Sequence, residues 1–208
     1  MADKLSPEDV TALFTRSSGD YAFARWGRPI APVIFGVDDA TLATFKGAIE
    51  AMVSLASHST AETDPELGAN LMFFFARTWD ELLDVPNLEQ LVPELAALVA
   101  RLNAASANQY RFFRFDSQGA IKAAFVFLRM DVHLSQMPAQ DLALAQAAQV
   151  MCLWSDTAFV KTSPLANADG VAVLRDDIAA LIRAAYATVL PSYSSDAAHA
   201  LRLWARLP

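Results

Sequence analysis

Residues 109–131 read QYRFFRFDSQGAIKAAFVFLRMD, and this stretch is the most informative about the fold. Two strand-like runs, residues 109–116 and 120–131, are separated by Ser117, Gln118 and Gly119, whose number and chemistry favour a hairpin turn. The second run is apolar on both faces, with Ala123, Phe125 and Phe127 on one side and Ala124, Val126 and Leu128 on the other. A strand of this kind is typical of the middle of a covered sheet.

Two further strands are predicted before the hairpin. Residues 70–78, NLMFFFART, form a short aromatic run that favours a buried strand. Residues 30–37 indicate extended structure, but Pro32 cannot donate a backbone hydrogen bond and restricts this segment to a sheet edge or a bulge. The sequence therefore predicts a sheet rich in aromatic residues.

Helices are predicted around these strands. Ser6 followed by Pro7 indicates a helix start, and Asp38 with Asp39 caps a second helix that extends to about residue 56. Leucines spaced by three and four residues predict a helix over residues 88–102, which begins late or bends because it contains Pro93. Further helices are expected at 141–153, 174–189 and 195–204, whereas 133–138 is expected to be a loop and 154–170 irregular.

This order of elements predicts an α+β fold. The 208 residues suit a single domain, and no repeat or linker divides them. We expect a mixed or antiparallel aromatic-rich sheet covered by helices, followed by a C-terminal helical part.

The composition limits the partners. Apolar residues make up 54% of the chain and the mean hydropathy is +0.27, which indicates a large core and either an Ala-rich helical protein or an apolar surface such as a homodimer interface. The net charge of −7 disfavours nucleic acid. Arg111, Arg114 and Lys122 alternate with aromatic residues on the hairpin, a pattern that suits either base stacking or the polar edge of a core.

Neither a membrane span nor a secretory signal is expected. No apolar run approaches the roughly 18 residues that cross a bilayer. The first ten residues, MADKLSPEDV, lack the basic and apolar regions of a signal peptide. We therefore expect a cytoplasmic protein with no membrane partner.

No catalytic residue, metal or cofactor is predicted. A zinc-peptidase helix needs two His four residues apart with a Glu after the first, whereas residues 141–157, DLALAQAAQVMCLWSDT, have Ala145, Gln146 and Gln149 at these positions. Cys152 lies among apolar residues with no nearby His, so it is not an activated nucleophile. The chain also lacks a G-x-S-x-G elbow and a Gly-rich phosphate loop.

Several segments in order resemble an uncharacterised bacterial family of zincin-like domains, which are related to metallopeptidases. The resemblance covers about residues 20–205. It is carried by RWGRPI at 25–30, ANLMFFF at 69–75, DSQGAI at 116–121 and AQAAQVMCLWSD at 145–156. In that family the last segment carries H-E-x-x-[QH].

The resemblance implies a zincin-like core in which the peptidase residues have been lost. Alanine offers no electron pair to zinc, and a Gln cannot act as the general base that the family's Glu provides. The candidate cleft residues are Gln146, Gln149, Cys152, Ser155, Asp156 and His133. Asp156 is either a structural turn residue or part of that cleft.

Three hypotheses follow. The first is a catalytically inactive domain that binds a protein or peptide in the cleft. The second is a hydrolase whose site is rebuilt from His133, Gln149, Cys152 and Asp156, which requires these four side chains to converge. The third is a structural homodimer.

Overall fold

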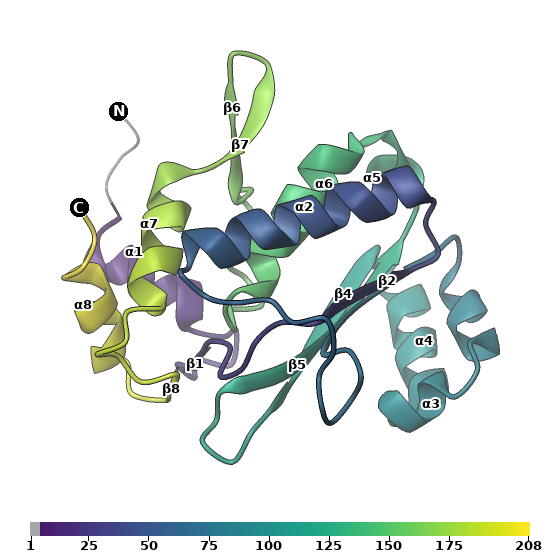
Figure 1. The fold of residues 1–208 in the computed structure, drawn as a ribbon, viewed down its shortest axis with the longest axis horizontal. Helices are drawn as coiled ribbons and strands as arrows, with labels where there is room; N and C mark the ends of the chain where they lie inside the picture. The colour runs from purple at the N-terminus through teal and green to yellow at the C-terminus, as the bar shows by residue number, and fades with distance from the viewer. Residues whose placement is uncertain (1–4) are drawn as a thin grey trace.

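The computed structural model describes residues 5–208. Residues 1–4 lie outside this range. They belong to the segment MADKLSPEDV, on which the expectation of no secretory signal rests. Figure 1 shows the fold, whose elements in chain order are α1 (Pro7–Phe14), β1 (Phe23–Ala24), β2 (Pro32–Phe35), α2 (Asp39–Leu55), β3 (Leu71–Ala76), the 3-10 helix η1 (Trp79–Asp84), α3 (Leu88–Leu91), α4 (Leu95–Ala104), β4 (Gln109–Phe115), β5 (Ile121–Arg129), α5 (Val132–Gln136), α6 (Ala139–Val150), β6 (Leu165–Ala168), β7 (Val171–Leu174), α7 (Asp176–Ala185), β8 (Tyr193–Ser194) and α8 (Ala198–Trp204).

A mixed four-stranded sheet forms the centre of the α+β domain. Its strand order is β2-β3-β5-β4, with β2, β3 and β5 parallel and β4 antiparallel to β5. The predicted hairpin is therefore confirmed, and β5, which is apolar on both faces, is an inner strand. Pro32 begins β2 at the opposite edge, where a missing backbone donor is tolerated.

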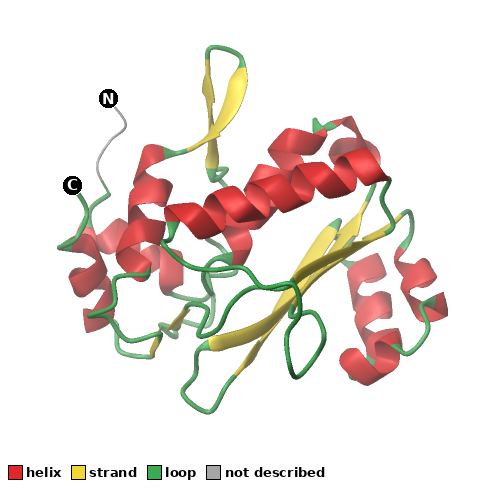
Figure 2. Cartoon of the chain, viewed as in Figure 1, coloured by secondary structure: helices red, strands yellow, loops and turns green. Residues whose placement is uncertain are grey.

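Helices cover both faces of the sheet (Figures 1 and 2). On one face, α2 and α6 pack over Phe73, Val126 and Leu128. On the other face, η1, α3 and α4 pack over Phe74 and Phe127, whose rings stack with centroids 4.9 Å apart. The alternation of β3 and β5 thus supplies two separate apolar cores, as the sequence pattern predicts.

The predicted helix starts are confirmed. The Ser6 hydroxyl accepts from the Asp9 backbone N–H at 3.1 Å, and the Asp9 carboxylate accepts from the Ser6 N–H at 2.9 Å, which forms a capping box. Asp38 caps α2 by accepting from the Thr41 N–H at 2.7 Å. These local bonds satisfy backbone donors that no helix can satisfy internally.

The expected late start or bend of the helix over residues 88–102 is confirmed, because Pro93 and the left-handed Glu94, at φ 56°, separate α3 from α4. Two other local predictions need correction. The loop expected over 133–138 contains α5, which is capped by Asp131. The stretch expected to be irregular, residues 154–170, contains β6, which pairs with β7 in a hairpin whose turn places Asp169 and Gly170 at positive φ.

The C-terminal part packs against α1 and β1 (Figure 1). Helix α8 contacts α1, and β8 pairs with β1 through Phe23 and Ser194. Within residues 5–208, no helix combines the length and the apolar character needed to cross a membrane.

His199 of α8 is buried in this region. Its Nδ1 lies 3.1 Å from the Tyr21 hydroxyl, its ring centroid lies 4.3 Å from that of Phe23, and its Nε2 is buried without a hydrogen-bond partner among the described residues. Burial, followed by repulsion from Arg202 and Arg206, lowers the pKa of His199 to about 4. The folded protein therefore favours the neutral ring.

We expect acid to destabilise the protein through this ring. The pKa of His199 is lower in the folded chain than its ordinary value, so between about pH 6.5 and pH 4 the unfolded chain binds a proton that the folded chain excludes. As the pH falls through this window, the free energy of unfolding should decrease by up to about 3 kcal/mol from His199 alone. Urea unfolding between pH 7 and pH 4 should show a smaller decrease for His199→Gln, and an unchanged pH dependence would contradict this assignment.

Candidate functional site

The C-terminal end of α6 is held by side chains from distant segments. Trp26 Nε1 donates to the Val150 carbonyl at 2.8 Å, and the Tyr186 hydroxyl donates to the Met151 carbonyl at 2.7 Å. Trp154 Nε1 donates to the Ala148 carbonyl at 3.1 Å. The bonds to Val150 and Met151 satisfy carbonyl groups at the end of the helix, and the three bonds together fix the helix on which Gln146 and Gln149 lie.

A part-buried polar network joins α6 to the edge strand β4. Arg111 Nη1 donates to Gln149 Oε1, and Nη2 donates to Gln146 Oε1 at 2.9 Å and to Gln109 Oε1 at 3.1 Å. Gln146, whose exposed fraction is only 2%, also donates through Nε2 to Gln109 Oε1 at 3.0 Å. Because a guanidinium only donates, all three amides must turn their oxygens toward it.

The guanidinium in this network has no acidic partner. Arg111 forms no ion pair with any carboxylate of residues 5–208, and its Nε is buried without a hydrogen-bond partner there. Burial lowers the pKa of Arg111 to about 10, so the group remains charged at neutral pH. The site therefore contains a fixed positive charge solvated by three neutral amides.

A cavity of about 790 Å³ opens beside this network, and we call it the β4 cleft. One wall is β4, whose outer edge makes no backbone hydrogen bond to another described segment. The cleft is lined by residues 109–113, Phe115, Gln149, residues 153–156, Phe159, Val160 and Arg16. It thus combines an open strand edge, an aromatic surface and two cationic side chains.

Three of the six predicted cleft residues line this cavity, namely Gln149, Ser155 and Asp156. Gln146 lies beneath it and bonds to the same guanidinium. Cys152 is fully buried, and its backbone bridges to Arg25. His133 is exposed on α5 and is not among the lining residues.

The turn after α6 ties the cleft to the end of α1. Ser155 donates through Oγ to the Thr15 carbonyl at 2.6 Å. Asp156 accepts from the Ser17 hydroxyl and, at 2.9 Å, from the Ser17 backbone N–H, and these bonds lower the pKa of its carboxyl group. Asp156 is therefore both a structural turn residue and part of the cleft wall.

Cys152 is not a nucleophile in this arrangement. Its thiol is completely buried, and burial raises the pKa of that thiol well above its ordinary value. Of the four side chains that the rebuilt hydrolase requires, only Gln149 and Asp156 line the same cavity.

The zinc that the zincin resemblance implies does not fit these residues. Ala145 has no donor atom, and the amide oxygens of Gln146 and Gln149 face the Arg111 guanidinium. A cation at that place repels a metal ion. Moreover, within residues 5–208 no three side chains of His, Cys, Asp or Glu gather closely enough to hold one.

Arg111 and Gln109 line the cleft although neither is among the six predicted cleft residues. Their signal is the alternation of β4, in which Gln109, Arg111 and Phe113 share the face toward α6. Arg114 points to the other face and donates to the Leu91 carbonyl, while Lys122 pairs with Glu66 at 2.7 Å. The three hairpin cations therefore form no common basic patch.

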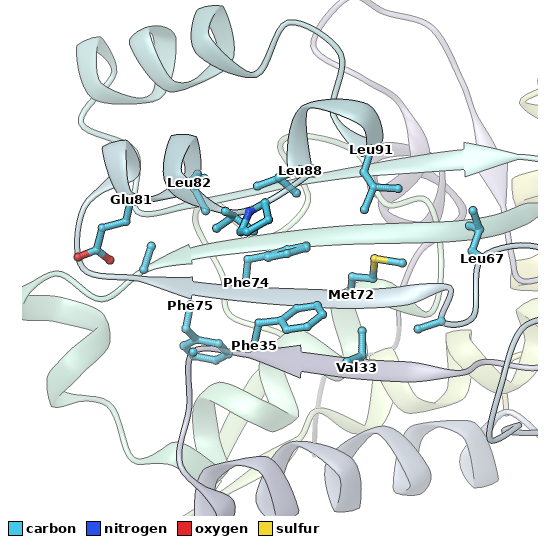
Figure 3. A pocket seen from close by; sticks show the side chains of 15 residues that line it. Val33, Phe35, Leu67, Met72, Phe74, Phe75, Glu81, Leu82, Leu88 and Leu91 are labelled. Atoms are coloured by element: carbon cyan, nitrogen blue, oxygen red, sulfur yellow. The ribbon is translucent and has the colours of Figure 1, made fainter.

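An apolar groove of about 640 Å³ lies at the opposite edge of the sheet (Figure 3). Val33 and Phe35 of β2, Met72 and Phe74 of β3, and Leu88 contribute to it, and Phe35 is 46% exposed. Glu81 is the single charged side chain among its lining residues, and it is paired with Arg77 at 2.9 Å. This groove is an apolar surface of the kind that the composition predicts. The homodimer stays a prediction, which light scattering can test.

Comparison with known proteins assigns this chain to no family, because no family model, no curated protein and no solved structure matches it.

Proposed function

We propose that this protein is a non-catalytic binding domain that holds an extended segment of a protein or peptide in the β4 cleft. The observation that carries the proposal is the open edge of β4 beside a network of Arg111, Gln146 and Gln149. This network binds groups by charge and hydrogen bonds, and it contains neither a nucleophile nor a general base.

The strand edge supports an extended partner. An unpaired edge presents backbone N–H and C=O groups that can add one more strand, while neighbouring pockets accept alternate side chains. The aromatic residues of the cleft, which include Trp154 and Phe159 with ring centroids 5.2 Å apart, supply such an apolar surface. Binding of this kind needs no chemical step.

Hydrogen exchange can test the proposal. A pool of N-acetylated random hexapeptides should slow exchange of the β4 amides whose N–H groups point away from β5, because these groups would pair with peptide carbonyls. The same pool with N-methylated backbone positions should give less protection, since it lacks donors. Protection that is absent, or that is equal with the N-methylated pool, would count against binding along this edge.

Metal analysis provides an independent test. Protein purified without chelators should hold less than about 0.1 zinc per chain, since the helix offers no imidazole or carboxylate pair. Stoichiometric zinc bound at α6, or chelator-sensitive peptide cleavage, would overturn the proposal and favour a metallopeptidase.

A further inference from the structure

We propose that the β4 cleft recognises a carboxylate group of its peptide partner, which binds to Arg111 and Gln149. The inference rests on the proposed function, because it names the chemical group that the same cleft binds. A carboxylate can come from the C-terminus of the partner or from an Asp or Glu side chain.

The first argument is the missing counter-charge. Arg111 is half-buried, its Nε is buried without a hydrogen-bond partner among the described residues, and its guanidinium is surrounded by the neutral oxygens of Gln109, Gln146 and Gln149. A cation that is partly removed from water is costly unless it is paired. These oxygens orient the guanidinium but leave its charge uncompensated. An anion from outside the chain would supply the missing charge.

The second argument is the set of free donors. Arg111 Nη1 carries two N–H groups, and one of them is used by Gln149 Oε1. The oxygen of Gln149 faces the guanidinium, so its Nε2 donors are directed elsewhere, and they make no hydrogen bond to another residue of the described chain. Two neighbouring donors of this kind match the two oxygens of a carboxylate.

The third argument is the charge balance of the cleft. Two cations, Arg16 and Arg111, and one acid, Asp156, line it, so its net formal charge is 2 − 1 = +1 in a chain of net charge −7. Asp156 is hydrogen-bonded to Ser17 and is not paired with either Arg. The surrounding aromatic residues lower the local dielectric, which strengthens a charge pair formed there.

Three hexapeptide pools test the source of the carboxylate in affinity selection. The first has free C-termini and no Asp or Glu, the second is amidated and contains Glu, and the third is amidated without acidic residues. The first or the second pool should be retained at least tenfold better than the third, and the better of the two identifies the source. Equal retention of all three would overturn the carboxylate inference and leave the proposed function standing.

Gln146→Glu is the sharpest variant, because it keeps the shape of the side chain and places a carboxylate against Arg111. It should reduce retention of the better-retained carboxylate pool at least tenfold and leave retention of the third pool, which has no carboxylate, unchanged. Gln136→Glu, an exposed substitution on α5 with the same change of charge, should have no effect. Equal retention by the two variants, each checked by circular dichroism, would argue against a role for Arg111.

A small carboxylic acid tests carboxylate binding without any peptide. Titration with 3-phenylpropionate should shift the Gln149 side-chain amide and the Arg111 Nε–H signals in NMR spectra, whereas 3-phenylpropanamide should not. Absent shifts with the acid would refute the inference even if peptides bind. Shifts with the acid but no retention of any peptide pool would instead refute the proposed function.

Discussion

Replacing Asn70 by Leu should lower the free energy of unfolding by about 4 kcal/mol. The side chain is fully buried just before β3, where its Oδ1 accepts from the Ala31 N–H at 2.8 Å. Its Nδ2 donates to the Pro29 carbonyl at 2.9 Å and to Asp64 at 3.1 Å. Leucine fills a similar volume but leaves all three partners without their bond, and each unsatisfied buried group costs about 1–3 kcal/mol.

The loss should be large because Asp64 depends on the same network. Burial disfavours its charged form, but hydrogen bonds from Leu67, Glu66 and Asn70 outweigh this effect and lower the pKa of the carboxyl group. Urea unfolding of Asn70→Leu can be compared with Asn103→Leu, which changes an exposed Asn of α4 and should cost less than about 0.5 kcal/mol. Similar losses for the two variants would contradict this account.

Replacing Trp26 by Ala should cost about 4 kcal/mol, the range expected when a fully buried Trp is truncated. The fully buried indole of Trp26 reaches α6, where its Nε1 donates to the Val150 carbonyl. Truncation therefore opens a cavity and also frees a carbonyl at the helix end.

Trp204→Ala is the matched control for this prediction. Trp204 also donates through Nε1, to the Leu5 carbonyl at 3.0 Å, but it is 37% exposed and lies on α8. Its truncation should cost about 1 kcal/mol, measured by the same urea unfolding. If the two variants lose equal stability, Trp26 does not anchor α6 as described.

The anchoring of α6 links these stability predictions to the cleft. Gln149 lies within one turn of the Val150 carbonyl that Trp26 holds, so a loosened helix end should also disturb the contact between Gln149 and Arg111. Trp26→Phe, which keeps most of the apolar volume but removes the donor, should show this effect with a smaller loss of stability. A reduced NMR shift with 3-phenylpropionate would reveal it.

The features that could be predicted from the sequence are those that depend on local chemistry. The apolar residues on both faces of 121–129 predicted the inner strand, because successive side chains of a strand point to opposite faces. Pro32 predicted a sheet edge because it lacks a backbone donor. Ser6 and Asp38 predicted helix starts because their side chains cap backbone N–H groups within a few residues. The Asp169-Gly170 turn also follows from local chemistry, because Asp-Gly favours the positive φ angles of a tight hairpin turn.

The cleft, in contrast, depends on contacts between segments that are distant in the sequence. Residues at 109–111 and 146–149 are separated by more than 30 positions, and no local pattern states that the Arg111 guanidinium meets Gln146 and Gln149 or that no carboxylate accompanies it. The absence of His and Glu from the zinc-peptidase spacing at residues 145–149 could be read along the chain, since coordination needs particular atoms. The positive charge at that place arises from packing β4 against α6, because the partners of a buried charge are set by the chain's path in space.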